Sequence, residues 1–150
     1  MVIRPATVDD VDGIEQVVHA AFSPYIERIG RPPAPMTLDY RTLVVDTHQV
    51  EVLVSGAVMA GVLVTVVEPD HLFIDTVAVA PWAQGHGHGR TLLSHTESRA
   101  RALGLTEVRL YTNAAMTENL RFYPRQGYLE VDRRDDMGFH RVYFAKNVCP

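Results

Sequence analysis

The sequence predicts a single α/β (α+β) domain over residues 1–150, with a mixed, mostly antiparallel central sheet of about six or seven strands and about four flanking helices. Three observations predict this fold class. Valine-rich runs alternate with amphipathic segments, glycines and prolines mark the boundaries, and no repeat, low-complexity tract or linker divides the chain. With 47% hydrophobic and 21% charged residues, the composition is that of a globular protein with a sizeable core.

The first forty residues predict a strand, a helix and an ordered loop. Residues 2–4 favour a short strand, and Thr7 can cap a helix over about residues 8–21. The apolar residues of that helix recur at helical spacing: Val11, Ile14, Val17, Val18 and Ala21. Residues 22–40 contain four prolines yet keep several large apolar side chains, which indicates a helical turn and an ordered loop rather than a flexible linker.

An uncharged, valine-rich run over residues 52–67 predicts two buried strands, at about 49–54 and 57–67. Its sixteen residues fall short of the roughly 18 needed to span a membrane, and Ser55-Gly56 interrupts it. We therefore expect no membrane association.

The second half of the chain continues the alternation of strands and helices. Leu92, Leu93, Ala100 and Leu103 fall on one face of an expected helix, which Gly104 ends. The elements expected here are a strand at about 71–79, a helix at 88–103, a strand at 108–111, a short helix at 115–123, and strands at 128–134 and 139–146 joined by a turn at 135–138.

Charge and cysteine content exclude several classes of protein. The formal net charge of −4 argues against a nucleic-acid binder that uses a basic face, so no nucleic-acid partner is expected. Cys149 is the only cysteine, which rules out an internal disulfide and favours a reducing, cytoplasmic compartment. The first residues lack the apolar core of a signal peptide.

A glycine-rich loop at the start of the 88–103 helix is the strongest functional signal. It reads Gln84-Gly85-His86-Gly87-His88-Gly89-Arg90, with glycine at every second position. Glycines leave the backbone amides unshielded, and the N-terminus of a helix attracts anions. The loop therefore predicts an anion site, and a phosphate is the expected ligand.

Two familiar phosphate loops do not fit this sequence. A P-loop requires Gly-Lys-Ser/Thr, whereas Gly89 precedes Arg90-Thr91 with different glycine spacing. A dinucleotide fold requires Gly-x-Gly-x-x-Gly near its first strand, whereas this Gly-x-Gly-x-Gly lies in mid-chain.

The loop and a second segment together resemble the GNAT family of acetyl-CoA-dependent N-acetyltransferases. That family has a strand ending in Val-x-Pro, followed by Gln/Arg-x-x-Gly-x-Gly/Ala at the start of a helix, and Val79-Ala80-Pro81 with the glycine loop matches it. The second segment is Asn119-Leu120-Arg121-Phe122-Tyr123-Pro124-Arg125-Gln126-Gly127-Tyr128. The order of the elements extends the resemblance over nearly the whole chain.

The resemblance implies acetyl-CoA, or coenzyme A, as the acyl-donor cosubstrate. It implies that amides of the loop bind the pyrophosphate, and that the strand before the loop splays and pairs with the pantetheine arm. The residues expected to contact coenzyme A are Val77, Ala78, Val79, Gln84, Gly85, His86, Gly87, His88, Gly89, Arg90, Asn119 and Phe122. Asn119 is included because Met116 stands where many relatives have the contacting asparagine.

Two residues are the candidates for acid–base chemistry. The resemblance makes Tyr123 the group that protonates the departing sulfur, although Pro124 favours a helix end at that tyrosine. Asp75 is the candidate base, on one strand face with His71, Phe73 and Val77, and Glu68 and His71 are the alternatives.

We expect transfer of an acetyl or short acyl group to an amine of a small molecule or protein, by direct attack in a ternary complex. The alternatives are a non-catalytic acyl-CoA-binding regulatory module, and transfer to a protein N-terminus or a hydroxyl. Tyr25, Arg28 and Met36 are candidates to line the acceptor site, and no metal is expected despite His86-x-His88. Pairing of exposed sheet edges would allow a homodimer.

Overall fold

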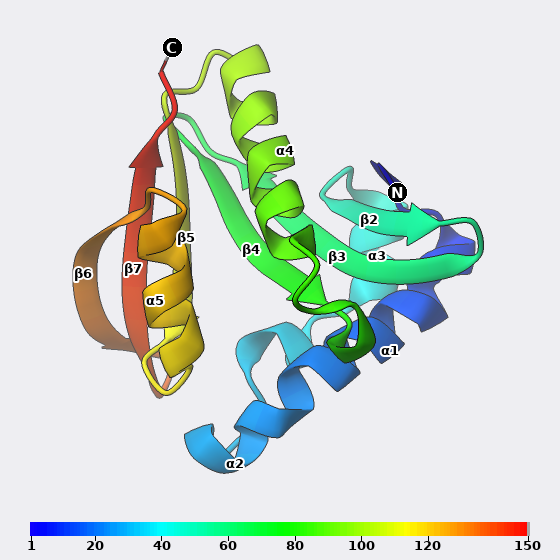
Figure 1. The fold of residues 1–150 in the computed structure, drawn as a ribbon, viewed down its shortest axis with the longest axis horizontal. Coiled ribbons are helices and arrows are strands. Elements are labelled where there is room, and N and C mark those ends of the chain that lie inside the picture. Colours follow the sequence, from blue (N-terminus) through cyan, green and yellow to red (C-terminus); the bar gives the residue numbers. More distant parts are fainter. Residues whose placement is uncertain (150) are drawn as a thin grey trace. The chain divides into compact units, whose positions relative to one another are not determined.

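The computed structural model describes residues 1–149 and contains one seven-stranded sheet (Figure 1). Its strands lie in the order β1-β2-β3-β4-β5-β7-β6. They are β1 Val2–Pro5, β2 Val50–Ser55, β3 Val58–Val67, β4 Leu72–Val79, β5 Glu107–Asn113, β6 Leu129–Asp136 and β7 Phe139–Asn147. The expectation of a mixed, mostly antiparallel sheet is confirmed, since the β1–β2, β2–β3, β5–β7 and β6–β7 pairs are antiparallel and β4–β5 is parallel.

Four helices of seven or more residues accompany the sheet, together with shorter turns. The longer helices are α1 Val11–Phe22, α3 Tyr40–Asp46, α4 His88–Ala102 and α5 Thr117–Arg125. The shorter pieces are α2 Ile26–Ile29 and the 3₁₀ turns η1 Val8–Asp10, η2 Ser23–Tyr25, η3 Ala34–Thr37 and η4 Pro81–Ala83.

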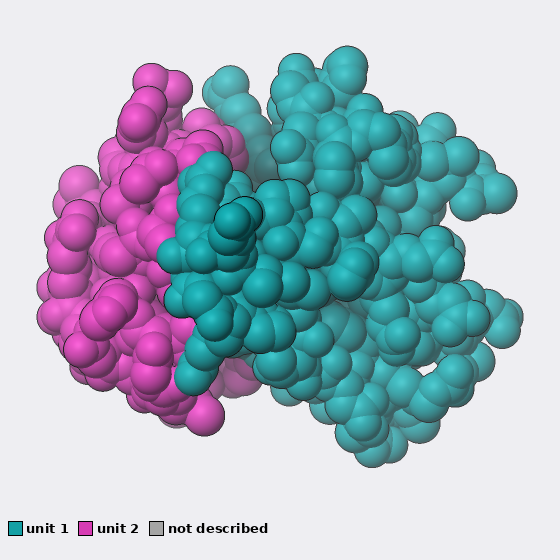
Figure 2. All heavy atoms as spheres, turned by 90° about the horizontal axis from the view of Figure 1, so that it is seen from below, with its two compact units in different colours: residues 1–65, 75–93 teal, residues 66–74, 94–150 magenta. Residues whose placement is uncertain are grey.

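The chain divides into two compact units, coloured separately in Figure 2. Unit 1 comprises residues 1–65 and 75–93, and unit 2 comprises residues 66–74 and 94 onward. Fully buried residues of unit 1 include Ile14, Val52, Leu63 and Leu92, and those of unit 2 include Leu72, Leu110, Tyr128 and Phe144. The assignment of residues 1–150 to one domain stays a prediction.

The valine-rich run forms two strands, as predicted. β2 and β3 pair in antiparallel register, and Gly56 adopts φ +60° in the turn between them. Glycine reaches this left-handed region at little cost, which explains its place in the turn. Within residues 1–149, no helix combines the length and the apolar character needed to cross a bilayer.

The first helical segment begins as predicted, with Thr7 as its N-cap. A 3₁₀ turn precedes α1, and Thr7 and Asp10 form a capping box, in which the Thr7 hydroxyl also lies 3.2 Å from the Asp10 carboxylate. The same carboxylate accepts from the Thr7 backbone amide at 2.7 Å and from Arg4 at 2.7 Å. Asp10 thus supplies the N3 side chain of the capping box, because its two oxygens can accept several donors at once.

Helix α3, which begins just beyond the proline-rich stretch, was not predicted from the sequence. Asp39 caps it by accepting a hydrogen bond from the Thr42 amide at 3.1 Å. The helix has only seven residues and two adjacent valines, so it carries a weak periodic signal. The predicted helical turn is present before it, as η2 and α2.

Two expectations about the later helices were wrong. Leu103, expected on the buried face of α4, is 49% exposed because the helix ends at Ala102. Gly104, at φ +75°, ends α4 as predicted. Pro124 lies inside α5 rather than ending it at Tyr123, because the lost amide donor falls in the last turn and affects a single helical hydrogen bond.

The final hairpin has a tighter turn than predicted. Asp136 pairs with Phe139, which leaves only Met137 and Gly138 in the turn, at φ 51° and 81°. Two consecutive positive φ values are typical of the type I′ turns that match the twist of paired strands.

Candidate functional site

The glycine loop has the open backbone expected of an anion site. Gly85 and Gly87 both adopt φ +81°, and a Cβ atom at either position would meet no heavy atom within 4 Å. Positive φ explains why glycine occupies both positions. The empty space beside them leaves the loop backbone accessible to a ligand.

Helix α4 begins directly on this loop. The Gly87 carbonyl accepts from both the amide and the hydroxyl of Thr91, each at 3.0 Å, and so closes the first turn of the helix. The amides before Thr91 therefore have no acceptor within the helix and, with the helix dipole, favour an anion. The open loop and the helix N-terminus on which the prediction depends are both present, and the anion site itself stays a prediction.

The residues that precede the glycines hold the loop against the end of β4. The Gln84 side-chain amide donates to the Val79 carbonyl at 3.2 Å, and the Ala80 amide donates to the Ala60 carbonyl at 2.8 Å. Ala83 is buried, whereas Trp82, the only tryptophan of the chain, is 60% exposed beside the loop. Gln84, predicted to contact coenzyme A, thus braces the loop through its amide nitrogen.

The two histidines of the loop lie side by side, with ring centroids 6.1 Å apart and an interplanar angle of 39°. His86 is exposed and His88 is half-buried. Within the described residues, no three His, Cys, Asp or Glu side chains gather in an arrangement that could hold a metal ion.

The strand before the loop presents Asp75 on its more exposed face. Leu72, Ile74, Thr76 and Ala78 are buried along β4, and the residues between them, including Asp75, are half-buried. This alternation confirms the predicted face. The ladder between β4 and β5 pairs Leu72–Ile74 with Val108–Leu110, and a splay beyond it stays a prediction.

Tyr40, which sequence analysis missed, belongs to the surroundings of Asp75 in unit 1. Its side chain is 3% exposed, and its hydroxyl donates to the Pro35 carbonyl at 2.6 Å. Burial raises the pKa of Tyr40 far above its ordinary value; the nearby Thr76 hydroxyl acts in the opposite direction, and the negative charge of Asp75 adds to the rise. Tyr40 therefore stays protonated and links the turn at Pro35 to this part of β4.

The two alternative bases lie at the turn between β3 and β4. The Glu68 amide donates to the His71 carbonyl at 2.9 Å, which closes the turn. His71 Nδ1 lies 2.6 Å from an Asp70 oxygen, and the imidazole holds the pKa of Asp70 below its ordinary value. Both alternatives belong to unit 2, whereas Asp75 belongs to unit 1.

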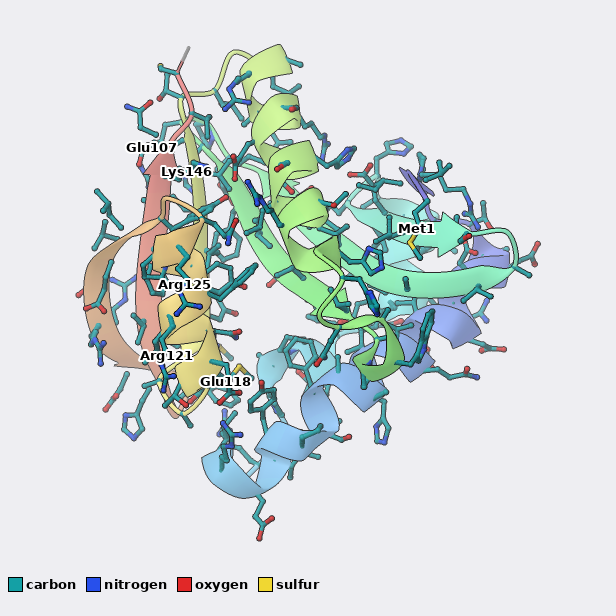
Figure 3. The ribbon with its side chains drawn as sticks, viewed as in Figure 1. Met1, Glu107, Glu118, Arg121, Arg125 and Lys146 are labelled. Atoms are coloured by element: carbon teal, nitrogen blue, oxygen red, sulfur yellow. The ribbon has the colours of Figure 1, made fainter. Side chains whose placement is uncertain are left out.

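Tyr123 is buried in an aromatic cluster of unit 2. Its side chain is 5% exposed, and its ring centroid lies 5.3 Å from that of Phe122, 6.0 Å from Tyr128 and 5.6 Å from Phe144. The opposite face of α5 carries the exposed residues Glu118, Arg121 and Arg125, labelled in Figure 3. The helix is therefore amphipathic, with Tyr123 on its inner face.

Asn119 and Met116 form an internal contact at the start of α5. The Asn119 side-chain amide donates to the Thr112 hydroxyl at 3.0 Å and lies 3.5 Å from the Met116 sulfur. Met116 is buried at 4% exposure, so it packs against β5 where many relatives have a polar contact. The carbonyl oxygen of Asn119 is the group of this side chain that suits a coenzyme A amide.

The structure separates the three candidate acceptor residues into two places within unit 1. The Arg28 guanidinium lies 5.0 Å from the centre of the Tyr25 ring, a cation–π contact on the turn formed by η2 and α2. Met36 instead lines a cavity of about 660 Å³, together with Tyr40 and the α1 residues Asp12, Glu15 and His19.

In this α/β fold a glycine loop precedes a long helix. That arrangement is typical of proteins that bind phosphorylated cosubstrates. Residues 14–128 match the model of the Acetyltransferase (GNAT) family, and the chain belongs to that family. The resemblance drawn from the two motifs is thereby confirmed.

Known proteins are similar to this chain over different shares of their length. The chain is 30% identical over 131 residues to an amino-acid acetyltransferase of Ralstonia nicotianae (strain ATCC BAA-1114 / GMI1000), covering 86% of this chain but only 26% of that protein. The ribosomal-protein-S18-alanine N-acetyltransferase of Escherichia coli has a similar fold, with a TM-score of 0.77 and 18% identity over 98% of this chain and 93% of that one.

A further similar structure is the PaiA N-acetyltransferase of Thermoplasma acidophilum in complex with coenzyme A. Its TM-score is 0.77, with 15% identity over 97% of this chain and 98% of that chain. These structures confirm the predicted fold class.

Proposed function

We propose that the protein transfers an acetyl or short acyl group from coenzyme A to an amine, by direct attack within a ternary complex. The observation that carries this proposal is the open loop at Gly85 and Gly87, which leads into α4 in a chain of the GNAT family. Its amides suit the pyrophosphate of coenzyme A, because two negative phosphates can accept several charge-assisted hydrogen bonds.

The proposed reaction needs a deprotonated amine and a proton for the leaving thiolate. An alkyl amine has a pKa near 10.4 and is almost wholly protonated at neutral pH, so a base increases the attacking fraction. We assign this role to Asp75, which is half-buried on β4. The amine nitrogen then attacks the thioester carbon, the carbon–sulfur bond breaks, and the Tyr123 hydroxyl donates its proton to the sulfur.

The proposed acceptor is an amine of a small molecule or a protein. The names of two similar proteins, which act on an amino acid and on an alanine of a ribosomal protein, support an amine as the acceptor class. Tyr25, Arg28 and Met36 remain the proposed acceptor contacts. We further propose a cytoplasmic protein that can form a homodimer; the single cysteine, Cys149, which is free and exposed, suits a reducing compartment.

The test measures thiol release from acetyl-CoA with a panel of amino acids, polyamines, aminoglycosides and peptides. Because Cys149 is an exposed free thiol, the assay uses the Cys149→Ser variant to remove the background signal. Binding of coenzyme A is followed separately by the fluorescence of Trp82, which lies beside the loop. Turnover of at least one amine is expected, and tight binding without turnover on any acceptor would contradict the proposed activity.

The role of Tyr123 is tested with a matched pair of variants. Tyr123→Phe is expected to lower kcat about 100-fold while leaving coenzyme A affinity within about twofold, because a general acid acts mainly in the transition state. Tyr143→Phe is the control: it removes a hydroxyl from a half-buried tyrosine that alternates with Phe144 on β7 and so faces the other side of the sheet. Equal kcat values for the two variants would remove Tyr123 from the mechanism.

A further inference from the structure

Unit 2 contains a group of three polar side chains, two buried and one half-buried, that the proposed reaction does not use. We name it the Glu97 cluster; it comprises Glu97 of α4, Tyr128 between α5 and β6, and Lys146 of β7, which Figure 3 labels. The Tyr128 hydroxyl donates to Glu97 Oε2 at 3.0 Å, and Lys146 Nζ donates to Glu97 Oε1 at 2.8 Å. Each carboxylate oxygen thus has its own donor.

The cost of burying these groups indicates a role other than overall stability. Glu97 is 7% exposed and Tyr128 is 1% exposed. Burial, and then the charge of Glu97, raises the pKa of Tyr128, so the phenol stays protonated and acts as a donor. A buried ion pair is generally no more stable than well-packed apolar residues in its place. Its benefit is a fixed geometry.

The cluster fixes the corner that follows α5. Lys146 Nζ also donates to the Gln126 carbonyl at 2.9 Å. Gly127 has φ +89°, and a Cβ atom there would lie 3.2 Å from Lys146 Cε. Lys146 is the only lysine among 14 cationic residues, and its slim chain fits closely beside a corner that only glycine suits.

This corner is bonded directly to Tyr123. The Tyr128 amide donates to the Tyr123 carbonyl at 3.1 Å, and the Gln126 amide donates to the same carbonyl at 3.0 Å. The rings of Tyr123 and Tyr128 also meet edge to face, with centroids 6.0 Å apart. Pro124 removes one amide donor from this last helical turn, so the turn relies more on its other bonds.

We propose that Glu97, Tyr128 and Lys146 are positioning residues, which hold the last turn of α5 and thereby set the direction of the Tyr123 side chain. The consequence for catalysis rests on the proposed function, in which the Tyr123 hydroxyl protonates the coenzyme A sulfur. A general acid must lie within hydrogen-bond reach of its target, so a small rotation of this turn costs rate without changing the affinity for coenzyme A.

The first test is spectroscopic and does not depend on activity. The protein is labelled with 3-fluorotyrosine at its six tyrosines, and the ¹⁹F signal of Tyr123 is identified by its loss in Tyr123→Phe. Tyr128→Phe, which deletes only the hydroxyl of the cluster, is expected to broaden or split that signal. Tyr143→Phe is the control and should leave it sharp and unmoved. A single, unshifted Tyr123 signal in Tyr128→Phe would overturn the positioning role.

The second test is a kinetic double-mutant cycle on an amine that the enzyme accepts. Tyr128→Phe alone is expected to lower kcat about tenfold, with KM for acetyl-CoA within about twofold. In the Tyr123→Phe background the same change should lower kcat less than twofold, because the acid it positions is already gone. Equal losses in both backgrounds would show a purely structural effect and overturn the proposal. Glu97→Gln, which keeps the shape of the side chain, should reproduce the Tyr128→Phe pattern.

The two tests separate failure of this inference from failure of the proposed function. If Tyr123→Phe leaves kcat unchanged, the assignment of Tyr123 as the acid fails, whereas the ¹⁹F result still decides whether the cluster holds its ring. If Tyr123→Phe lowers kcat but Tyr128→Phe leaves the ¹⁹F signal of Tyr123 unchanged, the assignment of Tyr123 as the acid is supported and the positioning role fails.

Discussion

Replacing Gly87 by alanine should abolish tight coenzyme A binding at a modest cost to folding. Gly87 adopts φ +81°, and a Cβ atom there meets nothing within 4 Å, so the added methyl causes no clash in the free protein. The folding cost is the left-handed backbone of a non-glycine residue, about 1–2 kcal/mol. For a chain of this size, that corresponds to a fall in Tm of roughly 2–8 °C.

The effect on binding should be much larger, because the methyl occupies the space above the loop amides. If it displaces the pyrophosphate from about two charge-assisted hydrogen bonds of about 1.5–3 kcal/mol each, binding weakens by roughly 3–6 kcal/mol. At about 1.4 kcal/mol per decade, Kd rises roughly 10²- to 10⁴-fold.

Gly104 provides a matched control at the other end of the same helix. It adopts φ +75° and also has nothing within 4 Å of an added Cβ atom, so Gly104→Ala carries the same backbone strain. Both variants are compared by thermal unfolding and by titration of Trp82 fluorescence with coenzyme A. We expect similar losses of Tm and a loss of affinity only in Gly87→Ala. Equal affinity in the two variants, at equal Tm, would refute the assignment of the loop to the pyrophosphate.

Three further predictions test the proposed base, the packing beside the loop and an ion pair. Asp75→Asn should lower kcat about 100-fold and remove the acidic limb of the pH–rate profile, and an unchanged profile would assign the base elsewhere. Gly61→Ala should destabilise unit 1 by about 1–3 kcal/mol in chemical unfolding, because the added Cβ would lie 3.2 Å from the Ala78 carbonyl oxygen. An unchanged free energy of unfolding would contradict this prediction and show that the strands can shift to make room for the methyl group. The Arg4 guanidinium lowers the pKa of Asp10 to about 2 from 3.8, so its stabilisation is present above about pH 4 and is lost as pH falls through about 2. With Arg4 40% exposed, we expect about 1 kcal/mol, and Asp10→Asn should flatten the stability curve over this window; an equally steep curve would contradict the assignment.

The fold was predictable wherever the signal lay within a few consecutive residues. Alternation in β4, the helical spacing of α1 and the turn at Gly56 are local patterns, and the structure reproduces them. The N-terminal cap at Thr7 was also predictable, because a threonine directly before an apolar helical pattern is a local signal. Helix α3 was missed because a seven-residue helix is stabilised by packing rather than by its own propensity.

Residues of the candidate site were likewise predictable where the signal was local and missed where it was not. The loop at Gly85 and Gly87 works through its backbone, so glycine spacing and a following helix were enough to predict it. Tyr123 came from a motif that the family resemblance supplied, and its aromatic neighbours Tyr128 and Phe144 lie five and 21 residues further along the chain. Tyr40 was missed because its role depends on contacts with Pro35 and β4, which no local pattern encodes.

The burial of Glu97 is nevertheless predictable from the sequence. Leu93 and Ala100 are buried on α4, and Glu97 lies four residues after the first and three before the second, so helical periodicity places its carboxylate on the buried stripe. A buried carboxylate needs a cation and further donors, or it is too costly to retain. The chain offers one lysine, Lys146, at an inward-facing end of an apolar strand, and a tyrosine follows the Gly127 corner. An acid within an apolar stripe, together with a solitary lysine in a sheet, therefore predicts a buried polar cluster. The contact itself is not predictable from local patterns, because the two partners are 49 positions apart in the sequence.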